Sequence, residues 1–207
     1  MRDGTLEIVQ IRAGEMANFT YLIYCPLTLR GVGVDPSFAP AALLDAARQR
    51  RVEIEVLVNT HGHADHIAGN GAVLAATGAR LAAHPLDVPG AEIPLGDESV
   101  LAVGKGSLQV LHTPGHTPGS LVLHPPGALI TGDTLFVTFV GRADLAGSDP
   151  AALYRSLRRL AALPPETLVY PGHDYGPQPV STIGYELAHN PFLQCGDLES
   201  FLRLRMG

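Results

Sequence analysis

Three histidines and one aspartate fall within six consecutive residues, in the segment Thr-His-Gly-His-Ala-Asp-His, as His61, His63, Asp65 and His66. Imidazole nitrogens and carboxylate oxygens are ligands that Zn, Fe and Mn accept in proteins. An exposed polar loop could also contain histidines, but this segment follows a short apolar strand pattern and precedes a helical one, as metal-binding motifs do. We therefore interpret it as a loop that binds metal, with His61 and His63 pointing one way and the other two ligands another.

Three later segments each place one more metal-type ligand after a predicted strand. His116 lies between two Pro-Gly turns in TPGHTPGS, Asp133 ends an apolar run in ITGDTLF, and His173 follows a strand in VYPGHDYG. Taken alone, each has an ordinary structural explanation: a turn, a helix cap or a buried ion pair. Together with the first segment, they supply enough ligands for two metals, including one carboxylate that both metals could share. Every segment follows the end of a strand, which is where α/β sheets place their sites.

The order of the predicted elements favours an α/β (α+β) protein. It is neither strict alternation of strand and helix nor all strand. We predict a four-layer αββα sandwich, in which two mixed β-sheets pack together with helices outside. Residues 84–106 are rich in Pro, Gly and acids and are predicted to be mostly loop. Strands are expected at 6–11, 19–24, 31–34, 54–58, 80–83, 107–112, 119–124, 127–132 and 167–170, and helices at 39–51, 67–77, 149–162, 181–189 and 197–205.

Composition limits the classes of function. The 207 residues, 46% hydrophobic and 16% charged, predict one domain over 1–207 that ends in a short helical segment at about 179–207. The net charge is −6 and Lys105 is the only lysine, so nucleic acid is not an expected partner. No signal peptide or stretch of about 20 apolar residues indicates a membrane. Cys25 and Cys195 form no CxxC pair and predict reduced thiols in a cytoplasmic protein.

The four ligand segments, in this order, resemble the metallo-β-lactamase superfamily, and the resemblance extends from Phe19 to His173. It implies the αββα fold and two divalent metals, with Zn²⁺ the first expectation and Fe or Mn as alternatives. It also implies that Asp133 bridges the two metals. The implied ligands are His61, His63 and His116 for one metal, and Asp65, His66 and His173 for the other.

Within that superfamily the sequence is most similar to a short form of the glyoxalase II and persulfide dioxygenase branch. Glyoxalase II implies a thioesterase that hydrolyses S-acylglutathione through a metal-bound hydroxide, with Asp65 and Asp133 as its catalytic carboxylates. A thioester suits this chemistry because a thiolate leaves without needing a proton. A persulfide dioxygenase would instead hold a single Fe(II) at His61, His116 and Asp133 and oxidise glutathione persulfide with O₂. We favour the thioesterase. Both alternatives imply a small thiol-derived substrate, and a homodimer is left open.

Two residues are candidates for substrate binding. Arg142, in Gly-Arg-Ala-Asp, matches a basic glutathione contact of glyoxalase II, but Asp144 stands where that family has Tyr, as in persulfide dioxygenases. Arg142 could bind a substrate carboxylate or pair with Asp144, and we favour the pairing. Tyr175 matches a glutathione-contacting Tyr of glyoxalase II, or it packs over the metal loop. Only 34 residues follow His173, so we expect most of the helical segment that binds glutathione in glyoxalase II to be missing. A binding module without metals is disfavoured, since every ligand is present.

Overall fold

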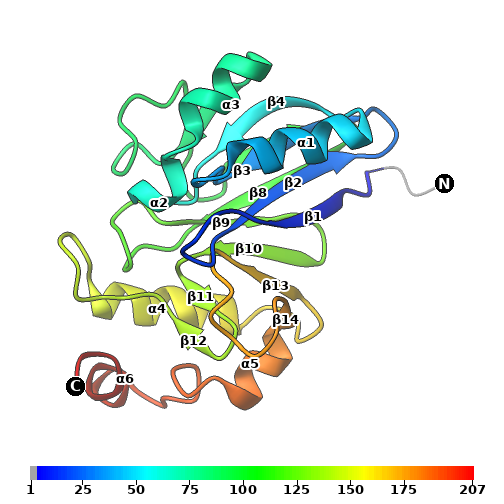
Figure 1. The fold of residues 1–207 in the computed structure, drawn as a ribbon. Coiled ribbons are helices and arrows are strands. Elements are labelled where there is room, and N and C mark those ends of the chain that lie inside the picture. The colour runs from blue at the N-terminus through cyan, green and yellow to red at the C-terminus, as the bar shows by residue number, and fades with distance from the viewer. Residues whose placement is uncertain (1–3) are drawn as a thin grey trace.

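Two six-stranded β-sheets face each other at the centre of the computed structural model, which describes residues 4–207 (Figure 1). The first three strands of the first sheet are antiparallel to one another, and the following strands are parallel, so the sheet is mixed. Its strands, in spatial order, are β1 (Glu7–Arg12), β2 (Phe19–Cys25), β3 (Arg30–Val34), β4 (Glu53–Val58), β5 (Arg80–Ala83) and β6 (Ile93–Pro94).

The second sheet is also mixed. Only its pair β10–β13 is parallel. A small hairpin, formed by β11 (Leu135–Phe136) and β12 (Phe139–Val140), follows β10. The strands of the second sheet, in spatial order, are β14 (Ser181–Thr182), β13 (Leu168–Pro171), β10 (Ala128–Gly132), β9 (Leu121–His124), β8 (Gly106–His112) and β7 (Val100–Val103).

Helices cover the outer face of each sheet (Figure 1). Helices α1 and α3 bury Leu43 and Val73 against the first sheet, while α4 and α6 bury Leu157 and Phe201 against the second. A third apolar cluster fills the space between the sheets, so the predicted four-layer αββα sandwich is confirmed. None of the helices within 4–207 has the length and apolar character to span a membrane. The helices are α1 (Pro40–Arg50), α2 (Ala64–Ile67), α3 (Asn70–Thr77), α4 (Pro150–Ala161), α5 (Ile183–His189) and α6 (Leu198–Met206).

The helix predicted at 67–77 is wrong in its extent, because the chain forms two short helices, α2 and α3, in its place. Gly69 lies between them, where a Cβ would stand 2.7 Å from the carbonyl oxygen of Ser37. The chain after β3 therefore packs against this break. As a result, two of the predicted ligands, Asp65 and His66, lie on α2 itself rather than in a loop before a helix.

The prediction that residues 84–106 are mostly loop missed two strands, β6 and β7. Strand β7 has an alternating pattern of buried and exposed residues and pairs with β8 at the edge of the second sheet. Its four residues are all apolar, so the sequence shows no alternation, and the strand is too short to stand out from its Gly- and Pro-rich surroundings. The hairpin β11–β12 was missed for a similar reason, since each of its strands has only two residues.

The loop that carries His116 is anchored on the first turn of α4. Asp149 caps this helix by accepting hydrogen bonds from Ala151 and Ala152, and its own amide donates to the carbonyl of Gly115 at 2.9 Å. Gly115 has φ +140°, and a Cβ there would lie 2.3 Å from the backbone of Leu153. The backbone of the loop therefore packs directly against the backbone of the helix.

We expect Gly115→Ala to lower the free energy of unfolding by about 2–5 kcal/mol, because it adds backbone strain to a steric clash with α4. Gly127→Ala is the matched control: Gly127 also has a positive φ, +76°, but a Cβ there would meet nothing within 4 Å. In the control variant, backbone strain alone should lower the free energy of unfolding, by about 1–2 kcal/mol. Urea unfolding of both variants gives the comparison, and equal losses would show that contact with α4 does not matter.

Candidate metal centre

All seven predicted ligands lie where strands β4, β8, β10 and β13 end. His61 and His63 directly follow β4, and the other two residues of their motif begin α2. His116 lies between β8 and β9, Asp133 follows β10, and His173 follows β13. The ligands therefore come from both sheets, and the sandwich brings their strand ends to one edge.

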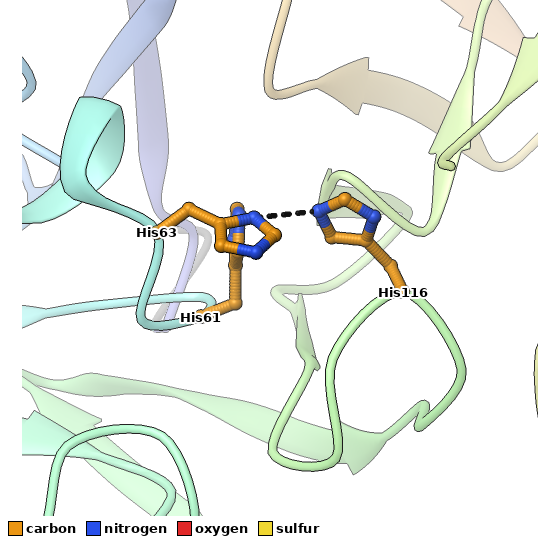
Figure 2. A group of neighbouring side chains, drawn as sticks. All are labelled: His61, His63 and His116. Atoms are coloured by element: carbon orange, nitrogen blue, oxygen red, sulfur yellow. Dashed lines mark hydrogen bonds between the residues drawn. The ribbon is translucent and has the colours of Figure 1, made fainter. Parts of the chain in front are cut away.

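His61, His63 and His116 form the first cluster, and their ligand nitrogens lie within 4.8 Å of one another. Figure 2 shows the three imidazoles converging from two separate loops. His63 Nδ1 and His116 Nε2 are 2.9 Å apart. Ring nitrogens of three histidines pointed at a common centre are the donor set of a metal site.

Asp65, His66 and His173 form the second cluster. The Nε2 atoms of its two histidines are 3.1 Å apart, and each lies 3.4 Å from the same oxygen of Asp65. Asp133 lies between the clusters, with one oxygen 3.3 Å from His66 Nε2 and the other 3.5 Å from His116 Nε2. The structure thus brings together the two ligand groups that the sequence analysis proposed, and Asp133, which was expected to bridge the metals, lies between the groups.

The outward-facing nitrogens of His116 and His173 already have partners. The Nδ1 atoms of His116 and His173 lie 2.8 and 2.9 Å from the carbonyl oxygens of Arg142 and Met16, to which they donate. Such contacts fix the orientation of each ring, so that Nε2 faces the centre. Among the residues described, His61 Nε2 and Asp133 Oδ1 are buried without a hydrogen-bond partner. Buried polar atoms without partners are costly, and metal ions would satisfy both.

Opposite charges stabilise each other in the second cluster. Burial favours the neutral acid, but His66 and His173 outweigh it and hold the pKa of Asp133 well below its ordinary value. Burial likewise disfavours charged His173, yet hydrogen bonds to Asp133 and Asp65 raise its pKa to about 9. By contrast, desolvation and neighbouring imidazoles lower the pKa of His61. The carboxylates therefore carry negative charge and require positive charge beside them.

Asp35 is a buried partner of the predicted ligand His66 that the sequence analysis missed. It is 2% exposed at the end of β3 and accepts hydrogen bonds from the amide and hydroxyl of Thr60, at 2.8 and 2.5 Å. Its second oxygen also lies 3.0 Å from His66 Nδ1. The available signal was an aspartate at the end of a strand, the same position that Asp133 occupies.

The two proposed substrate-binding residues border a cleft of about 380 Å³ over the centre, which also exposes Met16, Phe136 and Phe139. Arg142 makes a bidentate pair with Asp144, with both N–O distances 2.9 Å, which is the arrangement that the sequence analysis favoured. Tyr175 stacks on His173, with ring centroids 4.6 Å apart and planes 9° from parallel, and its ring also lines the cleft.

Comparison with known proteins identifies the family. The family model described as the metallo-beta-lactamase superfamily matches residues 31–173, and the chain belongs to this superfamily. A hydroxyacylglutathione hydrolase from Polaromonas sp. strain JS666 is 43% identical over 166 residues, which cover 76% of this chain and 62% of that protein. This chain therefore spans less than two thirds of that relative's length.

Two solved structures share the fold at similar sequence identity. The crystal structure of ETHE1 from Myxococcus xanthus is 33% identical, with a TM-score of 0.91 over 97% of this chain and 90% of that one. The structure of TTHA1623 in a di-iron-bound form is 34% identical, with a TM-score of 0.78 over 89% of this chain and all of that one.

We expect Asp133→Ala to bind fewer metal ions per chain and to hold those that remain at least about 10-fold more weakly, because the variant loses the carboxylate between the two clusters and loss of an outer-shell partner alone has an effect of that size. Metal content after dialysis against a chelator gives the measurement, and circular dichroism checks the fold. Asp45→Ala, on the exposed face of α1, is the control. Metal content equal to that of the control would contradict the bridging position of Asp133.

Proposed function

We propose that the protein is a two-metal hydrolase of glutathione thioesters, of the glyoxalase II type. The observation that carries the proposal is that both three-ligand clusters are assembled, with Asp133 between them. The likeness to hydroxyacylglutathione hydrolases supports the substrate class. The di-iron-bound structure of TTHA1623 supports a site for two metals.

His61, His63 and His116 would hold one metal and Asp65, His66 and His173 the other, with Asp133 contacting both. We propose Zn²⁺ as the metal, since imidazole and carboxylate ligands suit it, with Fe or Mn as alternatives. Metals bound there would supply Lewis-acid polarisation of the thioester carbonyl and activation of water at neutral pH.

The chain's own residues would orient and enclose the reactants. Asn18 donates a hydrogen bond to Asp65 Oδ2 at 3.0 Å and so fixes the carboxylate that we assign to orienting the water. Met16, Phe136 and Phe139 give the cleft apolar walls, which limit access of bulk water. Hydrolysis would form a C–O bond from water and break the C–S bond, which gives a carboxylate and a thiolate. The two protons of the water would pass to the solvent, and the thiolate would leave without a protein group to protonate it.

A persulfide dioxygenase is the second candidate, and a specific observation favours it. The chain matches ETHE1 of Myxococcus xanthus over nearly the whole of both chains, whereas it spans 62% of the hydrolase from Polaromonas. His61, His116 and Asp133 would then hold a single Fe(II) as two histidines and one carboxylate.

We also propose a cytoplasmic location for the protein. Both cysteines are free and buried, and this supports a reducing compartment such as the cytoplasm, whether the protein is a hydrolase or a dioxygenase.

Two assays on one preparation separate these candidates. Protein loaded with Zn²⁺ should release thiol from S-acetylglutathione, and Asp133→Ala should not. The same protein, loaded anaerobically with Fe(II), should take up no O₂ with glutathione persulfide in an oxygen electrode. Rapid O₂ uptake without thioester turnover would replace the hydrolase by the dioxygenase.

Asp144→Ala tests whether Arg142 binds substrate. The substitution frees the guanidinium, so KM for S-acetylglutathione should fall, but by no more than about fivefold, because exposed ion pairs are weak. Arg142→Ala should raise KM instead. If neither variant changes KM while both lower the melting temperature slightly, the pair is structural and the substrate contact is wrong.

A further inference from the structure

A short turn outside the ligand set contacts both loops of the first cluster. The turn follows β5 and is closed by hydrogen bonds from the amides of Asp87 and Val88 to the carbonyl of His84. His84 stacks on His112 of β8, with ring centroids 4.4 Å apart, so the turn is attached to the second sheet as well as to the first. This arrangement points the carboxylate of Asp87 at the ligand loops.

Asp87 accepts three hydrogen bonds from these loops. One oxygen accepts from the amide of Gly62 at 3.0 Å and from the hydroxyl of Thr117 at 2.6 Å, and the other accepts from the amide of Gly119 at 2.7 Å. Gly62 lies between His61 and His63, while Thr117 directly follows His116. One carboxylate therefore joins the two chain segments that supply the first cluster.

We propose that Asp87 is a positioning residue that sets the spacing of the first metal's three histidines. Because His61 and His63 extend from the first sheet and His116 from the second, neither sheet alone fixes the 2.9 Å between His63 Nδ1 and His116 Nε2. A link between the loops is required, and Asp87 provides three of its hydrogen bonds. The proposal depends on the metal ligands assigned above, but not on which reaction they support.

The glycines of both loops fit this role. Neither Gly62 nor Gly119 has a positive φ, so backbone conformation does not require glycine at either position. Instead, a Cβ at Gly119 would lie 2.6 Å from Asp87 Oδ1, and a Cβ at Gly62 would lie 2.7 Å from the Asp87 carbonyl oxygen. Asp87 thus approaches both loops so closely that a side chain is excluded.

The test is metal affinity and not activity. The affinity for Zn²⁺ should be measured by chelator competition, and the geometry of the first site by the visible absorption of the Co²⁺-loaded protein. Asp87→Ala should weaken binding about 10–100-fold and change the Co²⁺ spectrum, because the loops lose their common acceptor. Asp87→Asn and Thr117→Val should do the same to a smaller extent, and they carry the test if the alanine variant fails to fold.

Glu92→Gln is the matched control, since it removes an exposed carboxylate from the same connecting segment. A variant at Asp87 with the Zn²⁺ affinity and Co²⁺ spectrum of this control would overturn the proposal, even if its melting temperature fell, because Asp87 would then serve stability alone. Since no substrate is used, this result is independent of whether the protein hydrolyses thioesters.

A double-mutant cycle gives a second test. Gly119→Ala should weaken metal binding in the unchanged protein, where the new Cβ meets the carboxylate of Asp87. In the Asp87→Ala background, the same substitution should reduce the metal affinity much less, because the carboxylate oxygen that the new Cβ would meet is absent. Equal and additive losses in the two backgrounds would show that Gly119 and Asp87 act separately, which contradicts the proposed link.

Discussion

The convergence of buried imidazoles and carboxylates on one centre is the constraint on which the rest of the structure depends. Lone pairs that point at each other repel, and the charge of Asp133 is costly in a buried place unless positive charge lies beside it. The fold meets this constraint with hydrogen-bond acceptors on the outer side of the histidine rings. The carbonyls of Met16 and Arg142 and the carboxylate of Asp35 hold the histidines so that their free nitrogens face inward.

This constraint explains why the sandwich has two sheets that end at one edge. One sheet supplies His61 and His63. It also supplies Asp35, which contacts His66 on the helix that follows them. The other supplies His116, Asp133 and His173. Since the apolar cluster between the sheets is continuous, it fixes the sheets against each other. The remaining adjustment lies in the loops, where hydrogen bonds such as those of Asp87 set distances that packing alone leaves free.

The sequence was sufficient for the layers and for the residues that meet at the centre, because both depend on strong local patterns. Buried strands such as β2 and β10 have long apolar runs, and the histidine spacing of the first motif is rare. The missed parts lack such a pattern. The hairpin β11–β12 has two residues in each strand, and α2 and α3 separate where Gly69 meets the distant Ser37. Asp35 and Asp87 are single acids whose roles come from residues 25 to 32 positions away, which no local pattern records.

The hairpin that was hardest to predict also forms part of the wall of the cleft. Both candidate reactions draw their ligands from the same seven residues at the ends of the same strands, so the presence of these residues does not choose between the reactions and the walls of the cleft become relevant. Phe136 and Phe139 belong to the missed hairpin, and Thr138 at its turn donates its amide to the fully buried Glu186 at 2.8 Å. Asn190 binds the same carboxylate, so the C-terminal helices hold this wall in place. The hairpin and the residues behind it can therefore alter the wall of the cleft while the metal ligands stay as they are.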